Sequence, residues 1–257
     1  MGKLDGRVAI VTGAARGLGA ASAEALCAEG CAVMLADVLD QVTETAQALA
    51  TKGYRTAACH HDVTSDADWD RVVSETIRQL GDINVLVNNA GITLAASIDD
   101  ITIDDARRVM EINYFGPMRG MKAVLPSMRR TGNGSIINLS SNSTRMIIGI
   151  TAPYAPAKAA LALLTKNVAV HCAQAGDAIR CNSIHPGPNE TPMLFGPDMD
   201  RNADAAINLI KPMVAAIPMK RMGLPAEIGS VVAFLASDDS SYMTGAELFV
   251  DGGLSLL

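Results

Sequence analysis

The residues of this sequence best suited to chemistry lie between positions 141 and 158. Ser141 is followed thirteen positions later by Tyr154, and Lys158 comes four positions after that. Residues four apart lie on one face of a helix, so the tyrosine and lysine should stand one above the other. A neighbouring ammonium favours the phenolate and should lower the tyrosine pKa from about 10. Such a tyrosine can exchange a proton with an alcohol or carbonyl oxygen, to which the serine hydroxyl can also bond.

The same spacing occurs by chance in ordinary helices, where a half-buried tyrosine stands beside a solvated lysine, so the surrounding elements matter. Near the N-terminus an apolar run at 7–12 leads into TGAARGLG at 12–19. We expect a helix over about 20–29 and a second strand over 32–36 that ends at Asp37. Strand, glycine turn, helix, strand and acid form the layout of a dinucleotide site, whereas the glycines alone would indicate only a flexible loop.

The two charged residues of this unit favour different cofactors. Asp37 lies 18 residues after Gly19, close to the spacing of about 20 expected for the acid that binds a ribose 2′-hydroxyl. A carboxylate there repels a 2′-phosphate and favours NAD over NADP. Arg16 in the glycine loop could instead meet a 2′-phosphate. We give Asp37 more weight because its charge would lie against that phosphate.

The rest of the chain alternates in the same way. Further strands are expected near 55–60, 83–87, 135–139, 179–184 and 246–250, and helices over about 66–80, 104–130 with a break near Gly116-Pro117, 154–174 and 225–236. Alternating strands and helices predict an α/β protein with a parallel sheet. We expect one domain over 1–257: a Rossmann fold, doubly wound, with about seven strands and helices on both faces.

Polar residues and glycines follow many of these strands. Ligands of such sheets bind beyond the carboxyl ends of the strands, so these residues should gather at one edge. The residues concerned are Gly13, Asp37, Asp62, Asn89, Ser141 and His185-Pro186-Gly187.

Composition limits the other possibilities. Charged residues make up 19% of the chain and the net charge is −6, which leaves no basic patch for nucleic acid or for a membrane surface. No signal peptide or membrane-spanning run is evident, so we expect a cytoplasmic protein. The cysteines have no metal-binding spacing, and the histidines form no ligand cluster, so no metal is expected. We expect all five cysteines, at 27, 31, 59, 172 and 181, to be small buried residues.

Over essentially its whole length the chain resembles the short-chain dehydrogenases/reductases. The motifs are TGAARGLG (12–19), DV (62–63), NNAG (88–91), Asn113 in MEINY, SS (140–141), Tyr154 with Lys158, PGxxxT (186–191) and DGG (251–253). The resemblance implies an NAD(P)-dependent oxidoreductase that acts on an alcohol or carbonyl and is usually a tetramer.

The resemblance also implies roles for single residues. Tyr154 would be the acid/base, Lys158 would hold the nicotinamide ribose, and Ser141 rather than Ser140 would orient the substrate. Asn113 would position a relay water, although it could simply be an amide that caps or fills a helix kink. The cofactor would contact Gly13, Arg16, Gly17, Leu18, Gly19, Asp37, Asp62, Val63, Asn89, Ala90, Gly91, Tyr154, Lys158, Pro186, Gly187, Asn189 and Thr191.

Two positions depart from the family pattern. Pro156 and Ala157 stand where Ala-Ser is common, and a proline is tolerated only in a first helical turn. The helix should therefore begin just before Tyr154. Asn189 stands where an apolar residue is expected near the nicotinamide carboxamide, which puts the local cofactor contacts in question.

The substrate pocket is expected between the loop after Ser141 and an apolar lid over 188–218. Substrate contacts would come from Ser141, Tyr154, Met146, Ile147 and Met193, with Ile148, Leu194, Phe195, Met199, Leu209, Ile210 and Met213 close by. These apolar residues could instead only pack a helix pair. The stretches LADVLD, AIRCNSIHP and TGAEL resemble hydroxysteroid and cyclic-alcohol dehydrogenases and favour a bulky or cyclic secondary alcohol. Arg145 could instead meet an anionic substrate group.

Two alternatives remain open at this stage. An NADPH-dependent 3-oxoacyl-thioester reductase would share the family motifs, but Asp37 disfavours its cofactor. A catalytically silent NAD-binding regulator would be free to lose Tyr154 or Lys158, and this chain keeps both.

Overall fold

The computed structural model describes residues 2–195 and 204–257, with only the backbone described at 195 and 204–209. Within these residues, seven strands form one parallel sheet in the order β3-β2-β1-β4-β5-β6-β7. The strands are β1 (Val8–Thr12), β2 (Ala32–Asp37), β3 (Thr56–His60), β4 (Val85–Asn88), β5 (Gly134–Leu139), β6 (Ile179–Pro186) and β7 (Glu247–Val250). The order reverses direction beside β1, as in a doubly wound sheet, so the predicted α/β Rossmann fold is confirmed.

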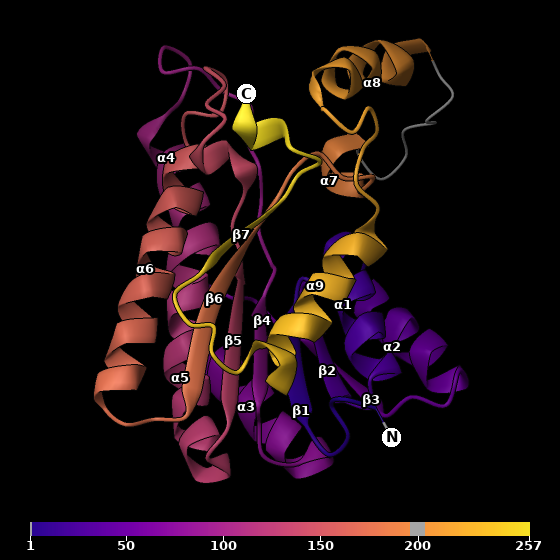
Figure 1. Ribbon diagram of the computed structural model, residues 1–257, viewed down its shortest axis with the longest axis vertical. Helices are drawn as coiled ribbons and strands as arrows, with labels where there is room; N and C mark the ends of the chain where they lie inside the picture. Colours follow the sequence, from indigo (N-terminus) through magenta and orange to yellow (C-terminus); the bar gives the residue numbers. More distant parts are fainter. Residues whose placement is uncertain (1, 196–203) are drawn as a thin grey trace.

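Helices cover both faces of the sheet (Figure 1). The described helices are α1 (Gly17–Ala28), α2 (Gln41–Thr51), α3 (Asp66–Leu80), α4 (Ile103–Met110), α5 (Gly116–Thr131), α6 (Tyr154–Gln174), α7 (Pro192–Phe195), α8 (Asp204–Ala216) and α9 (Pro225–Ala236). One core packs α1, α2 and α9 on a face that includes Ala9 and Val11. The other packs α3, α5 and α6 against Val8 and Ile10. Successive residues of β1 thus alternate between two buried faces.

The predicted elements agree with the observed ones except at a few places. Helix α2 was not located from the sequence, although Val42, Ala46 and Leu49 bury one face of it. The expected helix over 104–130 consists of α4, the π-helical turn η1 (Glu111–Phe115) and α5. The break therefore comes just before Gly116-Pro117. Strand β6 runs two residues further than expected and includes His185 and Pro186.

One prediction about the cysteines is wrong. Four of the five are buried, but Cys59 is only half-buried. It lies on β3, which is an edge strand of the described sheet and has no buried residue. With a neighbouring strand on one side only, its side chains remain accessible to water.

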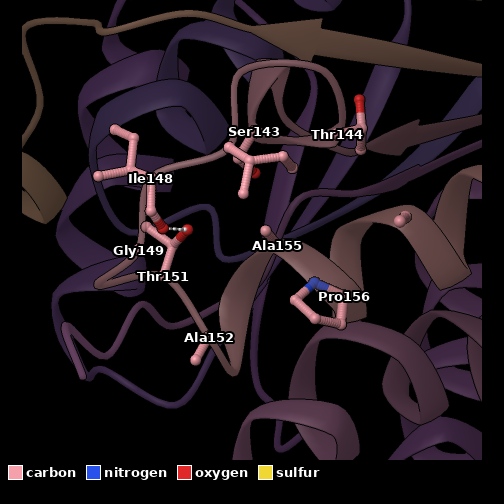
Figure 2. Close-up of a pocket in the computed structure, with 10 residues that line it drawn as sticks. Ser143, Thr144, Ile148, Gly149, Thr151, Ala152, Ala155 and Pro156 are labelled. Atoms are coloured by element: carbon pink, nitrogen blue, oxygen red, sulfur yellow. Dashed lines mark hydrogen bonds between the residues drawn. The ribbon is translucent and has the colours of Figure 1, made fainter. Parts of the chain in front are cut away.

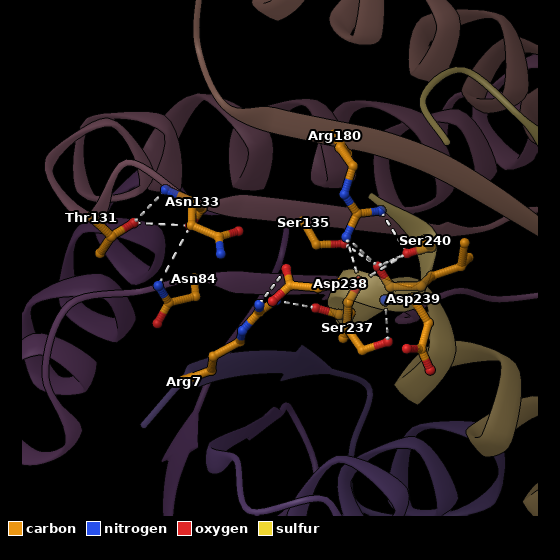
Figure 3. Close-up of polar contacts among 12 residues, drawn as sticks. Arg7, Asn84, Thr131, Asn133, Ser135, Arg180, Ser237, Asp238, Asp239 and Ser240 are labelled. Carbon is orange, nitrogen blue, oxygen red and sulfur yellow. Dashed lines mark hydrogen bonds and ion pairs between the residues drawn. The ribbon is translucent and has the colours of Figure 1, made fainter. Parts of the chain in front are cut away.

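The amino edge of the sheet is closed by a polar network (Figure 3). Arg7 donates to the carbonyl of Ala236 at 2.5 Å and pairs with Asp238 at 2.6 Å. Arg180 and the Ser135 hydroxyl both donate to the carbonyl of Leu235, at 2.8 and 2.7 Å. These contacts satisfy the last carbonyls of α9, which have no partner within the helix. They attach the end of α9 to β5, to β6 and to the residue directly before β1, at the amino ends of these strands.

Candidate active site

The site begins with a tight glycine turn between β1 and α1. Gly13 and Gly17 have φ of +63° and +60°, a region that favours glycine. A Cβ on Gly13 would lie 2.8 Å from the Cα of Ala90, and one on Gly19 would lie 2.1 Å from the Gly13 carbonyl oxygen. Any side chain would fill this cradle. The turn therefore fits the close approach of a pyrophosphate to backbone at the N-terminus of α1.

Asn89 and Ala90 fix the position of this turn. Their backbone N–H groups both donate to the Thr12 hydroxyl at 3.1 Å. The Asn89 side chain donates to the carbonyls of Thr12 and Gly13 at 2.9 and 3.0 Å. These bonds tie the end of β4 to the end of β1. Both residues shape the cleft, and their direct contact with a cofactor stays a prediction.

Asp37 lies beside the same turn. Its side chain is 8% exposed and accepts from the backbone N–H groups of Ala15 at 2.9 Å and Leu39 at 3.0 Å. The carboxylate is therefore held in place at the end of β2. Arg16 is exposed, and among the described residues it forms no ion pair. Two backbone hydrogen bonds thus hold the Asp37 carboxylate, whereas no such bond holds the Arg16 side chain among the described residues.

Asp62 and Val63 build the turn into α3. The Asp62 carboxylate accepts from the backbone N–H and hydroxyl of Thr64 at 2.9 and 2.8 Å, and the Val63 carbonyl accepts from the Trp69 indole at 3.0 Å. Next to them, His61 is buried with its edge against Trp69, and within the described part of the chain neither ring nitrogen has a partner at hydrogen-bond distance. Burial lowers the pKa of His61 to about 4, so the ring is neutral at pH 7.

Asn113 lies in the π-helical turn and is completely buried. Its side chain accepts from the Ile92 N–H at 3.0 Å and donates to the Ile92 carbonyl at 2.9 Å, so it ties the π-helical turn to the loop that follows β4. A Cβ on Gly91 would lie 2.6 Å from the Asn113 side-chain oxygen and 3.4 Å from Lys158 Nζ. Gly91, Asn113 and Lys158 therefore meet at one point. Single π-turns of this kind often occur at functional sites.

Helix α6 begins at Tyr154, as Pro156 predicted, because the proline then lies in the first turn. Lys158 Nζ lies 5.7 Å from the centre of the Tyr154 ring and donates to the Leu139 carbonyl at 2.8 Å. The Ser141 hydroxyl interacts with that of Tyr154 and lowers the tyrosine pKa. Serine, tyrosine and lysine thus come together although they belong to two different elements.

The pKa pattern of this group differs from the sequence prediction. Burial raises the pKa of Tyr154, while the hydrogen bond from Ser141 lowers it. Burial lowers the pKa of Lys158 to about 8, since only 4% of this residue is exposed. The expectation that Lys158 lowers the tyrosine pKa is wrong for this structure. The ammonium is directed at a backbone carbonyl, and desolvation outweighs its distant charge.

The segment after β6 faces the glycine turn. A Cβ on Gly17 would lie 3.7 Å from the Thr191 side chain, so these residues stand on opposite sides of a narrow gap. Asn189 donates to the Gly187 carbonyl at 2.8 Å, and its buried side-chain oxygen has no hydrogen-bond partner among the described residues. The strand itself ends at Pro186. This polar residue, unexpected from the family pattern, supports its own loop.

A pocket of about 270 Å³ lies beside the start of α6 (Figure 2). It is lined by Ser143, Thr144, Ile147, Ile148, Gly149, Thr151, Ala152, Ala155, Pro156 and Ala159. Successive helical residues are 100° apart, so Pro156 and Ala159 point away from Tyr154. Neither Ser141 nor Tyr154 lines it. The contact of Ile147 with a substrate therefore stays a prediction.

The segment in which a lid is expected includes the described helices α7 and α8, which stand beyond the carboxyl ends of the strands (Figure 1). Met193 is exposed on α7, and Met146 is half-buried in the loop after Ser141. Leu194, Ile210 and Met213 are half-buried. Met199 and the side chains of Phe195 and Leu209 lie outside the described residues.

Comparison with known proteins bears on this arrangement. A family model described as enoyl-(acyl carrier protein) reductase matches residues 13–255. The oxidoreductase UcpA of Salmonella typhimurium is 38% identical over all of this chain and 97% of its own length. A 3-beta-hydroxysteroid dehydrogenase of Comamonas testosteroni is 39% identical over 98% of this chain and 97% of its own. The crystal structure of gox2181 superimposes with a TM-score of 0.91 at 32% identity, covering 99% and 98% of the two chains.

The chain belongs to the short-chain dehydrogenase/reductase family. It is an NAD(P)-dependent alcohol dehydrogenase or ketone reductase, as that family and its oxidoreductase relatives indicate. Among the described residues, no helix is long and apolar enough to cross a membrane.

Sequence reasoning missed one residue of this short-chain dehydrogenase/reductase site. His185 was placed only at a strand end, yet its ring lies 3.0 Å from the Ser141 carbonyl oxygen. The available signal was its position directly before the Pro-Gly pair that follows β6.

Proposed function

We propose that this enzyme transfers a hydride between NAD(H) and a secondary alcohol or ketone that is bulky or cyclic, as a hydroxysteroid is. The observation that carries the chemistry is the convergence of Ser141, Tyr154 and Lys158, with Lys158 beside Gly91 in the loop after β4. The bound nicotinamide supplies the redox chemistry, and the protein supplies geometry and proton transfer.

Each residue has a distinct task in the proposed reaction. During oxidation Tyr154 would act as the phenolate and take the proton of the substrate hydroxyl, and during reduction the resulting phenol would return that proton to the carbonyl oxygen. The Ser141 hydroxyl donates to that same oxygen and stabilises the charge that develops on it. Lys158 holds the ribose hydroxyls of the cofactor, and Asn113 keeps the neighbouring kink open for a water that relays protons.

The preference for NAD follows from electrostatics. The Asp37 carboxylate is fixed by two backbone N–H groups at the end of β2, where the adenosine ribose of a dinucleotide would lie. A 2′-hydroxyl can donate to this carboxylate, whereas a 2′-phosphate would be repelled by it. Arg16 is exposed and unpaired within the described residues and does not neutralise the acid.

The proposed substrate class rests on relatives and on the lid. The Comamonas testosteroni relative is a 3-beta-hydroxysteroid dehydrogenase, and several stretches of this chain resemble enzymes of that kind. In the segment proposed as a lid, Met193 is exposed and Met213 is half-buried, and the flexible side chains of methionines adapt to apolar ligands. Together with the sheet, this segment would form a single domain that closes over a bulky alcohol.

We further propose a homotetramer in the cytoplasm. The outer face of α6 carries the exposed residues Pro156, Ala159, Leu163 and Val170, and the two larger ones are 61% and 54% exposed. Such a stripe favours a second copy of the chain as its partner. Size-exclusion chromatography with light scattering should give four subunits for the wild type. Leu163→Glu should give fewer, and an unchanged mass would contradict this interface.

A second candidate is an NADPH-dependent 3-oxoacyl-thioester reductase. The matched family model is described as an acyl-carrier-protein reductase, which favours an acyl thioester. The fixed Asp37 carboxylate speaks against the phosphorylated cofactor.

Initial rates with NAD and NADP on steroidal and small cyclic alcohols distinguish the two candidates. We expect turnover with NAD and little with NADP. Asp37→Asn keeps the shape of the side chain and should reduce the difference between the rates with NAD and with NADP. Asp40→Asn, an exposed control at the start of α2, should leave that difference unchanged. Preference for NADP by the wild type would favour the thioester reductase.

A further inference from the structure

His185 is a buried histidine to which the proposed reaction gives no role. It lies near the carboxyl end of β6 and is 0% exposed. Its Nδ1 atom is 3.0 Å from both the Ser141 carbonyl oxygen and the Thr144 hydroxyl. Its Nε2 atom is 3.0 Å from the Ser183 hydroxyl. Both ring nitrogens therefore have polar partners.

These partners determine which nitrogen carries the proton. The Ser141 carbonyl oxygen can only accept a hydrogen bond, so Nδ1 must be the donor. Nε2 then has a lone pair that accepts from the Ser183 hydroxyl. The competing acceptor, the Ala246 carbonyl, lies further away at 3.3 Å and already accepts from the Ser183 backbone N–H at 2.9 Å. The ring is thus a neutral imidazole with its proton on Nδ1.

The surroundings keep the ring neutral and in place. The imidazole ring stacks on the Phe249 ring with the centroids 4.5 Å apart. The Arg145 guanidinium lies over the Phe249 ring, 3.9 Å from its centroid. Burial is the main cause that lowers the pKa of His185. The charges of Arg145 and Lys166 also lower it, while the hydrogen bond to Ser141 and the charge of Glu247 raise it.

The contact with Ser141 reaches the chemistry through the backbone. The Ser141 carbonyl also accepts from the Thr144 hydroxyl at 2.9 Å, so two donors fix this peptide group. The Ser141 hydroxyl oxygen accepts from the Ser143 N–H at 3.1 Å, which leaves its own proton available to Tyr154, whose pKa this hydroxyl lowers. Rotation of the peptide would break these bonds and turn the serine away from the tyrosine.

We propose that His185 is a positioning residue that, through its Nδ1–H, holds the Ser141 carbonyl and so keeps the serine hydroxyl bonded to Tyr154. The catalytic part of this inference rests on the proposed oxidoreductase function. The geometric part concerns Tyr154 itself and is measurable without any substrate.

The first test is a spectrophotometric titration of Tyr154, obtained by subtracting the Tyr154→Phe protein. His185→Leu removes the donor, and the tyrosine pKa should rise by about one unit, as expected for the loss of one hydrogen bond to the phenolate. His185→Asn places an amide N–H where Nδ1–H stood and should keep the wild-type value. The exposed His171→Leu is the matched control. Equal pKa values in the wild type and His185→Leu would overturn the proposal, as would equal shifts in His185→Leu and His185→Asn.

The second test measures turnover of any alcohol accepted by the wild type. His185→Leu should lower kcat about tenfold, since the serine bond is made in the transition state, and should leave NADH affinity unchanged. His185→Asn should restore most of kcat. An unchanged kcat in His185→Leu would overturn the catalytic part. If the wild type turns over no alcohol, the proposed function fails, and the titration still decides the geometry.

A third measurement needs no variant. Nitrogen chemical shifts of histidine-labelled wild-type protein report which ring nitrogen is protonated. We expect His185, distinguished from the buried His61 by through-bond assignment to its own backbone, to carry the proton on Nδ1. A proton on Nε2 would overturn the proposal even if every variant failed to fold.

Discussion

The buried charge of Lys158 has a measurable effect on stability. Burial lowers the pKa of Lys158 from 10.5 to about 8. Between these values the unfolded chain binds more protons at this residue than the folded one, so stability should rise with pH across the window. By pH 10 this gain amounts to about 2.5 kcal/mol. Below pH 8 the lysine is charged in both states and the full cost of burying the charge is present.

Lys158→Met removes the charge and keeps the length of the side chain, so it should remove this pH dependence. Between pH 7 and pH 10 the difference between the free energies of unfolding of wild type and variant should change by about 2.5 kcal/mol in favour of the wild type. Other groups that titrate in this range, cysteines and tyrosines included, cancel in the difference. The hydrogen bond to Leu139, which only the wild type has, adds a constant to this difference and does not affect how the difference changes with pH.

Urea unfolding at one protein concentration and at several pH values between 7 and 10 gives this difference directly. Lys122→Met is the matched control, since Lys122 is exposed on α5, and its curve should run parallel to that of the wild type. Parallel curves for Lys158→Met as well would refute the reasoning, because Lys158 would then titrate alike in both states. The variant should also lose alcohol turnover, so the residue lowers stability where it serves the reaction.

Three further substitutions test the site. Gly19→Ala places a methyl group 2.1 Å from the Gly13 carbonyl oxygen and should abolish NADH binding, measured by fluorescence titration, in a protein that remains folded. Gly91→Ala places one 2.6 Å from the side-chain oxygen of Asn113. Because this buried amide must shift, we expect at least tenfold lower kcat and about 1–3 kcal/mol lower stability in urea. Asn138→Ala removes a fully buried amide that bonds neighbours on both sides and should cost about 2–4 kcal/mol in urea unfolding. A variant that behaves like the wild type in its assay would contradict the role given to the contact that the substitution changes.

Much of the fold follows from local patterns. The strands are short apolar runs bounded by glycine or polar residues, and the parallel sheet forces their carboxyl ends to one edge. Glycine spacing predicted the turn at Gly13 because only glycine tolerates its backbone and its contacts. Pro156 fixed the start of α6 to within one residue, since a proline interior to that helix would have broken it.

What the sequence did not predict depends on tertiary contacts. The raised pKa of Tyr154 and the lowered pKa of Lys158 arise from burial, which residue spacing cannot supply. The sequence allows Asn113 to be either a kink-filling amide or part of the site. In the structure its amide bonds Ile92 and lies beside Gly91, as Lys158 does, and its part in the reaction stays a prediction. His185 meets Ser141 only because β5 and β6 are neighbours in the sheet.

The central claim is that Tyr154 carries out acid/base chemistry for NAD-linked oxidation of a secondary alcohol. The most direct test follows NADH absorbance while wild type and Tyr154→Phe act on a panel of steroidal and cyclic secondary alcohols. We predict turnover by the wild type that falls by at least about a hundredfold in Tyr154→Phe, with NADH still bound. Equal turnover by both proteins would contradict the assignment of Tyr154. Tight NADH binding without turnover of any alcohol would contradict the proposed substrate class.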